Sequence, residues 1–329
     1  METRFATEDD IPAIIDLLKT GLGETLVPKS EGYWRWKHLE NPFGDSLVLL
    51  AVKKENIIGV RTFMRWQWKV GEEPIEAVRG VDTVIHPDYQ GNGIFGELTM
   101  ELMKKCEEKG YHILFSTPNE RSKRGYLKLG WERPDHLPVN VKVIRPFRIL
   151  TNVLRKRKPL EPGQGVHNSV AYYLSRPDLD ALLVMNEKHY PSKIITAHTR
   201  QSLQWRYAQV PVGRYYAIGV EMQGTKALCF YRLKSTYAGT EMRITDIFLE
   251  SARFEKDLKN VLVKKIVEHD IDFVTSGSFN VARLVSGVLA LSRKSIGPCV
   301  TTHKISLPDL RNFGGFANWS PSLGDLELF

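Results

Sequence analysis

The chain has 329 residues, of which 42% are hydrophobic and 26% charged, a composition typical of a globular protein with two domains of ordinary size. No apolar run approaches the ~20 residues that a membrane-spanning helix needs, and the N-terminus lacks the apolar stretch of a signal peptide. Three cysteines form no C-x-x-C pair and leave an odd count, so we expect a reducing cytoplasm rather than a disulfide framework. The net charge of +8 is modest for this length, and no Cys/His cluster predicts a metal.

The first part of the chain predicts a helix followed by antiparallel strands. Residues 5–20 are typical of a strand end and a helix, with Thr7 as the N-cap. Residues 46–53 and 57–70 alternate in the manner of antiparallel strands, and residues 71–74 have the composition of a turn. We therefore expect an antiparallel sheet to begin in this region.

A buried strand, a glycine loop and a helix follow. Residues 77–85 are small or β-branched, as in a central strand, and Pro87 ends that strand because it has no N–H group. The sequence Gly91-Asn92-Gly93 permits positive φ angles and brings bare N–H groups close to a ligand. A helix begins near Gly93, and its apolar face repeats every four residues through Ile94, Leu98, Leu102 and Cys106. Because a glycine loop at a helix N-terminus binds anions, the sequence predicts a phosphate-containing ligand.

Two common phosphate-binding motifs do not fit this loop. Gly91, Gly93 and Gly96 match the G-x-G-x-x-G pattern of dinucleotide-binding proteins, in which the first glycine follows the strand at once and an acidic residue ends the next strand. Here residues 86–90 intervene, and the next strand, residues 113–116, is followed by threonine. No Lys-Ser/Thr pair follows the glycines to make a P-loop. A simple surface turn remains the alternative interpretation.

A second motif comes after the next strand. Asn119 and Ser122 precede the block Tyr126-x-Lys128-x-Gly130-Trp131, and the chain starts with Arg4-x-Ala6-Thr7-x-x-Asp10. Together with Gln90-x-x-Gly93, these motifs resemble the GCN5-related N-acetyltransferase (GNAT) superfamily over about residues 3–135. The family's loop usually has glycine or alanine where this chain has Phe95.

The resemblance implies a mixed α/β fold, with a mostly antiparallel sheet flanked by helices, and a binding site for acetyl-CoA without a metal. The loop would hold the pyrophosphate through its N–H groups, and the strand before it would pair with the pantetheine arm. The implied acetyl-CoA-binding residues are Thr83, Val84, Ile85, Gln90, Gly91, Asn92, Gly93, Ile94, Phe95, Gly96, Asn119, Ser122 and Lys128.

The resemblance also implies that Tyr126 is the general acid that protonates the leaving thiolate. The alternative for Tyr126 is a helix residue that packs on the sheet with its hydroxyl exposed. For the general base, Asp82 and Glu120 are both candidates, and we leave it unassigned.

A basic segment follows the first domain. Residues 145–158 contain six lysines and arginines and no acid, and residues 161–165 are rich in proline and glycine. We expect residues 148–165 to be a linker between domains 1–147 and 166–329. Such a run can attract nucleic acid or an anionic membrane surface, although most short basic runs are simply solvated. Because no nucleic-acid fold motif is present, we do not expect a nucleic-acid partner.

The second half of the chain echoes the first. The spacing of Trp36-Lys37-His38, Pro42 and Gly44 returns as Trp205-Arg206-Tyr207, Pro211 and Gly213, and the segment around Asp82 corresponds loosely to that around Asp246. A duplicated α/β domain is the simplest explanation. The second copy has no glycine loop and places Glu250 where a pyrophosphate would lie. We therefore expect it to bind no CoA and instead to shape the acceptor site or form a homodimer contact.

The leading hypothesis is an N-acetyltransferase that moves the acetyl group of acetyl-CoA directly to a primary amine of a small molecule or peptide. The second hypothesis is a protein that senses or binds acyl-CoA without turnover. The acceptor itself is not encoded in a readable motif: amino sugars, polyamines, antibiotics and peptide amines all remain open.

Overall fold

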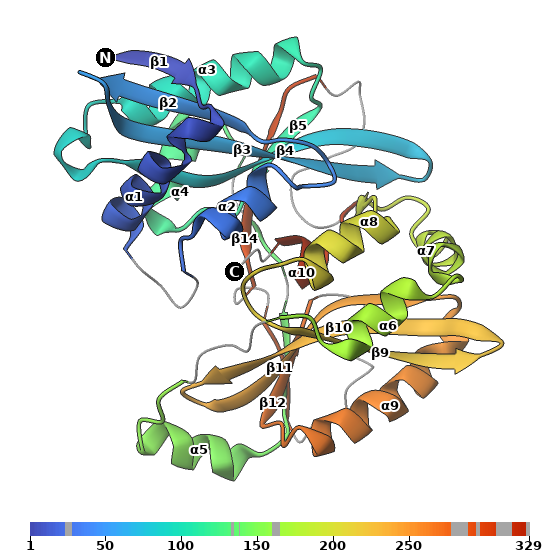
Figure 1. Ribbon diagram of the computed structural model, residues 1–329. Coiled ribbons are helices and arrows are strands. Elements are labelled where there is room, and N and C mark those ends of the chain that lie inside the picture. Colours follow the sequence, from blue (N-terminus) through green and yellow to red (C-terminus); the bar gives the residue numbers. More distant parts are fainter. Residues whose placement is uncertain are drawn as a thin grey trace. The chain divides into compact units, whose positions relative to one another are not determined.

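The computed structural model describes residues 1–23, 28–132, 135–137, 139–159, 165–277, 289–293, 297–306 and 318–326 (Figure 1). The chain forms two compact units, residues 1–135 with 299–318 and residues 136–298 with 319–329. Each unit has one sheet flanked by helices, so the mixed α/β fold class is confirmed. Among the described helices, none combines the length and apolarity that crossing a bilayer requires.

The first unit is built on a mostly antiparallel sheet in the order β1-β2-β3-β4-β5-β14, in which only β4 and β5 run parallel. Its strands are β1 (Glu2–Phe5), β2 (Leu47–Lys53), β3 (Asn56–Val70), β4 (Glu73–Ile85), β5 (Ile113–Ser116) and β14 (Cys299–Lys304). Its helices are α1 (Ile11–Leu22), α2 (Glu31–His38), α3 (Ile94–Glu108) and α4 (Glu120–Lys128), with single 3₁₀ turns at Glu8–Asp10 and Pro87–Tyr89.

Side chains that alternate along the strands of this sheet fill two cores, one on each face. On one face, Leu49 and Ala51 of β2 pack with the predicted apolar stripe of α3, all four members of which are buried. On the other face, Leu50 and Val52 pack with the apolar stripe of α1. Both faces are therefore covered by helices, and the residues that bind ligands have to lie at the ends and edges of strands.

The parallel ladder between β4 and β5 is short. It pairs residues 77–80 with residues 113–116 and ends at Gly80 and Ser116, although β4 continues to Ile85. Close to this point, the register between β3 and β4 shifts between Val60 and Thr62, which marks a β-bulge in β4 at Asp82 and Thr83, opposite Arg61. Beyond the bulge, the described part of β4 pairs only with β3, so the edge that faces β5 is open.

The second unit has a sheet in the order β13-β7-β12-β11-β10-β9, in which only β11 and β12 run parallel. Its strands are β7 (Val139–Val143), β9 (Tyr215–Met222), β10 (Gly224–Thr236), β11 (Gly239–Leu249), β12 (Phe273–Ser276) and β13 (Leu289–Arg293), and the short strands β6 (Asp135–His136) and β8 (Ile195–Thr196) lie outside this sheet. Its helices are α5 (Pro146–Leu154), α6 (Asn168–Ser175), α7 (Leu179–Glu187), α8 (Arg200–Leu203), α9 (Glu255–Glu268) and α10 (Leu323–Leu326), with a π turn at Gln204–Ala208 and a 3₁₀ turn at Ala252–Phe254.

Both units contain the same succession of three antiparallel strands, a helix and a parallel strand. The ladder between β11 and β12 also ends early, at Ile244 and Ser276, and the register of β10 and β11 also shifts, between Phe230 and Tyr231. The apolar face of α9 is buried through Leu258, Leu262 and Ile266, together with Phe254 just before the helix. The two sheets thus fit a duplicated domain.

The domain boundaries differ from those expected. β5 is flanked by β14, which comes from residues 299–304, and β12 is flanked by β7, which comes from residues 139–143. Each sheet therefore takes one strand from beyond the expected boundary. The expected linker 148–165 is also corrected in part, because residues 146–154 form α5 and pack in the second unit.

Candidate functional site

The predicted loop has the geometry of an anion cradle. Gly91 and Gly93 have φ angles of 82° and 79°, and Gly93 is the N-cap of α3. Residues 90–93 are exposed, and the first N–H groups of a helix have no intrahelical partner. The side chains of Gln90 and Asn92 donate within the loop, to the carbonyl oxygens of Ile85 and Tyr89 at 3.0 and 3.1 Å. The loop therefore offers a ligand its backbone, while these two side chains hold its shape.

Phe95 points away from the loop and into the core. Its ring lies 5.7 Å from that of Tyr126 in an edge-on contact, and a Cβ on Gly125 would lie 2.8 Å from the ring. Glycine at position 125 therefore makes room for Phe95. Phe95 thus packs between α3 and α4, and the N–H groups of its neighbours Ile94 and Gly96 lie in the first turn of α3.

Thr83, Val84 and Ile85 lie on the part of β4 whose edge toward β5 is open. The side chain of Val84 is buried on the α1 side, whereas Thr83 Oγ1 accepts a hydrogen bond of 2.6 Å from Arg61 Nη1. An extended chain could add to this open edge as a further strand. The strand leads directly to the glycine loop, so the two predicted binding features are continuous.

Tyr126 is 3% exposed, and its hydroxyl group lies beside a guanidinium group. Arg61 Nη2 donates to the Tyr126 oxygen at 2.9 Å, and Ser116 Oγ lies 3.1 Å from the same oxygen. Arg61 itself is fully buried, and its Nε donates to Thr99 Oγ1 at 3.1 Å. No carboxylate of the described residues forms an ion pair with Arg61. Arg61 belongs to no sequence motif, and its position in a strongly apolar strand was the available signal.

The remaining predicted binding residues belong to α4. Asn119 Oδ1 accepts a hydrogen bond of 2.9 Å from the N–H of Ser122, so Asn119 caps this helix. Lys128 is exposed at the other end of the helix. The structure therefore brings Tyr126 to the open edge of β4 and gives Asn119 and Ser122 a structural role, while their contact with a ligand stays a prediction.

Asp82 sits in the bulge of β4 with a φ angle of 40°. Its Oδ2 atom lies 2.6 Å from Lys37 Nζ and 2.9 Å from His38 Nε2, and both partners come from α2. Burial alone would raise the pKa of Asp82, but the adjacent Lys37 ammonium and the bond from His38 hold it below its usual range. A carboxylate held ionised in this way is a weak base. Glu120, the other candidate base, has a side chain that is 88% exposed, so the base remains unassigned.

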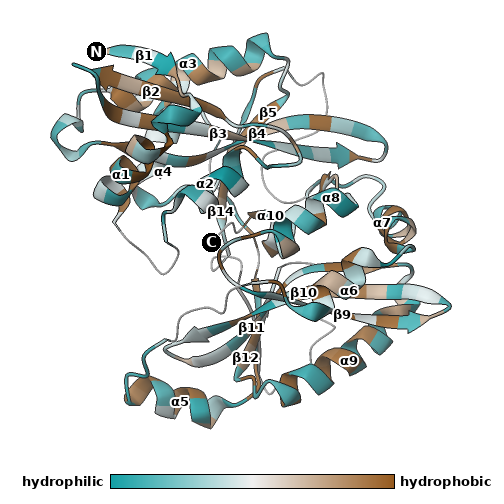
Figure 2. Cartoon of the chain, viewed as in Figure 1, coloured by the Kyte–Doolittle hydropathy of each residue, from teal (hydrophilic) through white to brown (hydrophobic). Residues whose placement is uncertain are grey.

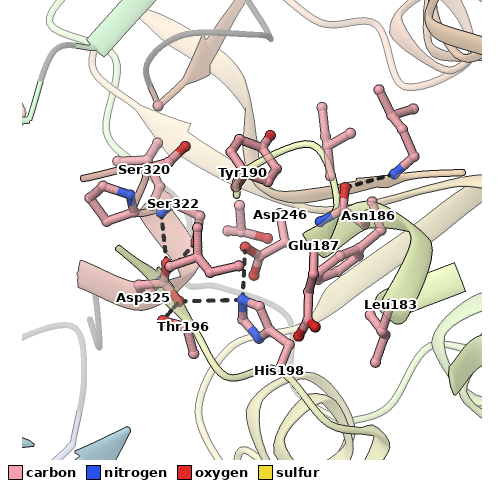
Figure 3. A pocket seen from close by; sticks show the side chains of 18 of the residues that line it. Leu183, Asn186, Glu187, Tyr190, Thr196, His198, Asp246, Ser320, Ser322 and Asp325 are labelled. Carbon is pink, nitrogen blue, oxygen red and sulfur yellow. Dashed lines mark hydrogen bonds and ion pairs between the residues drawn. The ribbon is translucent and has the colours of Figure 1, made fainter. Parts of the chain in front are cut away.

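The second unit contains a pocket of about 90 Å³ that opens to solvent and is lined by the open half of β11 and by residues 320–325 (Figure 3). His198 Nε2 lies 3.5 Å from Asp325 Oδ1 and 4.0 Å from Asp246 Oδ1. Burial raises the pKa of Asp325, and the nearby charge of Asp246 adds to the effect. One side-chain atom each of His198, Asp246 and Asp325 lie within 4.8 Å of one another. These atoms could hold a divalent cation, or a proton shared among them could balance the two carboxylates. No motif marks these residues, because they lie far apart in the sequence.

The glycine cradle, the open edge of β4 and the buried Tyr126 all belong to the first unit. Residues 2–133 match the family model described as an acetyltransferase (GNAT) domain. The first unit therefore carries a GNAT domain, and the resemblance seen in the sequence is confirmed. The comparison with curated proteins found no match.

Solved structures of similar fold cover nearly the whole chain. A GCN5-related N-acetyltransferase from Anabaena variabilis is 15% identical with a TM-score of 0.64, over 93% of this chain and 73% of that one. A probable N-acyltransferase from Enterococcus faecalis is 11% identical with a TM-score of 0.61, over 92% and 72%. A GCN5-related N-acetyltransferase from Kribbella flavida is 12% identical with a TM-score of 0.58, over 92% and 71%. At these identities the likeness concerns the fold.

Gly93→Val is expected to abolish binding of acetyl-CoA, because valine cannot easily adopt a φ angle of 79° and its branches would occupy the space of the anion. Isothermal titration calorimetry measures the affinity. Gly110→Val is the matched control, since Gly110 has a φ angle of 74° and open space around it but lies at the far end of α3. Unchanged affinity in folded Gly93→Val protein would refute the cradle.

Lys37→Met is expected to destabilise the fold by about 3 kcal/mol, because it leaves the carboxylate of Asp82 without its ammonium partner. Urea unfolding measures the loss, and Lys37→Met combined with Asp82→Asn should recover part of it. Because the pKa of Asp82 is lowered in the folded state, the wild-type ion pair stabilises the protein above the unfolded pKa of ~3.9 and less as the pH falls below it. An equal loss for Lys128→Met, at an exposed position, would contradict this role.

Proposed function

We propose that the first unit transfers the acetyl group of acetyl-CoA to a primary amine by direct transfer. The observation that carries this proposal is the continuity of the open β4 edge with the glycine cradle at the start of α3. A pantetheine arm that pairs with the strand would place its thioester near the level of the bulge, and its pyrophosphate would reach the N–H groups of residues 91–96.

In this proposal, separate groups of the chain polarise the carbonyl, protonate the leaving sulfur and stabilise the resulting charge. The Thr83–Ile85 segment pairs with the donor as a neighbouring strand, and one of its backbone N–H groups polarises the thioester carbonyl group. The amine nitrogen attacks the carbonyl carbon, the C–S bond breaks, and the proton of Tyr126 goes to the leaving sulfur. The buried guanidinium of Arg61, 2.9 Å from the Tyr126 oxygen, stabilises the negative charge that remains on that oxygen. The amine loses its own proton to water or to a base that stays unassigned.

The second candidate function is acyl-CoA binding without turnover. It is favoured by the lack of a suitable base among the two candidates. The carboxylate of Asp82 is already paired with Lys37 and His38, and the side chain of Glu120 is 88% exposed. Incubation of the protein with acetyl-CoA and a panel of primary amines separates the two functions. Release of free CoA that depends on an amine supports the transferase, whereas tight binding without release supports the sensor.

We also propose that the second unit is a degenerate copy of the GNAT fold that binds no CoA. The turn after β11 carries the side chains of Glu250, Ser251 and Ala252 where the first unit has glycines. The carboxylate of Glu250 lies 2.6 Å from Lys226 Nζ, and so this side chain is held at the turn, where the first unit offers bare backbone. Such a unit can contribute to acceptor binding or to a homodimer contact.

Tyr126→Phe is expected to lower turnover by roughly 10²–10⁴-fold with little change in acetyl-CoA affinity, because the variant keeps the ring and removes only the proton donor. Steady-state kinetics and calorimetry give the two quantities. Tyr111→Phe, which removes another phenolic hydroxyl of the same unit, is the matched control. Wild-type turnover in the Tyr126 variant would remove this residue from the mechanism.

One acetyl-CoA is expected to bind per chain. A carboxylate ~4 Å from a pyrophosphate costs on the order of several kcal/mol at an intermediate dielectric constant, so the turn that contains Glu250 should not accept the ligand. Calorimetric titration measures the stoichiometry, and Gly93→Val should abolish binding completely. A plateau at two ligands per chain, or a second site that survives this substitution, would contradict the proposal.

A further inference from the structure

Helix α5 packs on the second unit through its polar side. Arg148 bonds to the carboxylates of Asp270 and Asp272, and Asn152 Nδ2 donates to the carbonyl oxygen of Ala238 at 3.1 Å. In a helix, positions 148 and 152 are one turn apart and share a face. This face is therefore the one that contacts the body of the unit.

The apolar side of α5 is exposed instead. Phe147 is 83% exposed, Leu150 57%, Val153 52% and Leu154 71%. Figure 2 shows the hydrophobic residues of this helix among hydrophilic ones, on an element at the margin of its unit. A surface helix normally buries its apolar side and exposes its polar side, so the orientation of α5 is the reverse of the usual one. An exposed apolar patch of this kind marks a surface that binds something.

The segment after the patch is strongly basic. Arg155, Lys156 and Lys158 are exposed, and none of them forms an ion pair with another described residue. Between residues 145 and 158 the sequence has no acidic residue. Among the described residues, the acids that pair with this segment are Asp270 and Asp272, and their partners are Arg145, Arg148 and Arg157. The free cations therefore lie next to the apolar patch.

We propose that α5 and residues 155–158 form a docking surface for an anionic lipid membrane. Phe147, Leu150 and Leu154 would enter the boundary between headgroups and acyl chains, while the basic residues pair with lipid phosphates. The charge complementarity favours this occupant over a second copy of the chain, because two copies would bring like charges together. The four exposed apolar side chains favour a membrane over a nucleic acid, because the phosphate backbone of a nucleic acid would not bury them.

This inference does not depend on the proposed acetyl transfer. It concerns attachment of the protein to a membrane surface, and the acyl-CoA site lies in the other unit. An interfacial helix of this kind adds affinity from two sources, the apolar area that enters the lipid and the attraction of basic residues to anionic headgroups. The two contributions can be tested separately, because only the electrostatic attraction depends on the salt concentration and on the charge of the lipids.

Flotation of the full chain with vesicles tests the proposal. We expect the protein to float with vesicles of equal parts phosphatidylcholine and phosphatidylglycerol and not with phosphatidylcholine alone. Raising the salt concentration from about 0.1 M to about 1 M shortens the Debye length from ~10 Å to ~3 Å and should lower the bound fraction. Phe147→Ser combined with Leu154→Ser should weaken binding by about tenfold or more, because both side chains lose their contact with lipid.

Val267→Ser is the matched control, because Val267 is 68% exposed on α9 and its loss should leave binding unchanged. Lys156→Glu combined with Lys158→Glu tests the charge and should also release the protein. The proposal is overturned if the chain fails to float with anionic vesicles or floats equally with neutral ones. It is also overturned if sedimentation reveals a dimer that Phe147→Ser dissociates, since the patch would then be an interface between copies.

Discussion

The carboxylate of Asp82 in β4 forms an ion pair with Lys37 and a hydrogen bond with His38, both of α2. The open edge of β4 depends on these two contacts. Asp82 adopts a φ angle of 40°, which costs of order 1–2 kcal/mol for a residue other than glycine. Lys37 and His38 hold its carboxylate on one side of the strand and stabilise the bulge. Because the bulge ends the ladder with β5, the following residues of β4 can pair with a ligand. The strand edge proposed to bind the acyl-CoA donor thus lies next to a buried ion pair in the sheet.

The second unit has a similar carboxylate next to a register shift, which indicates that this carboxylate has a structural role. Asp246 occupies the place of Asp82 in β11, next to a register shift, and Tyr207 bonds to it as His38 bonds to Asp82. Arg206, which stands where Lys37 stands in the first copy, instead donates to Tyr215 and to the carbonyl oxygen of Gly324. The carboxylate in the bulge is therefore present in a unit without a glycine cradle, which favours a structural role for Asp82 over that of a base.

Local signals in the sequence predicted the local structure well. The strand before Pro87, the positive φ angles of Gly91 and Gly93 and the apolar stripe of α3 follow from residue type and spacing alone, and the repeat around Trp36 and Trp205 indicated the duplication. Contacts between distant segments were not predicted. No pattern in β14 marks β5 as its partner, since any alternating strand can pair with any other, and the exchange of β7 and β14 therefore displaced the domain boundaries. The contacts of Arg61 with Tyr126 likewise depend on the folded sheet.

The basic segment shows why composition could not distinguish a linker from a docked helix. Asp272 is fully buried and accepts a hydrogen bond of 2.7 Å from the N–H of Thr240, so its charge needs a cation. Arg148 supplies that cation and sets the rotation of α5. Turning the apolar side inward would remove Arg148 from Asp272 and leave the buried carboxylate with only the longer contact of 3.9 Å to Arg157 Nη1. Breaking a buried ion pair in this way costs about 3–5 kcal/mol. The ion pair therefore keeps Phe147 and Leu154 exposed, and the partner of this surface has to come from outside the unit.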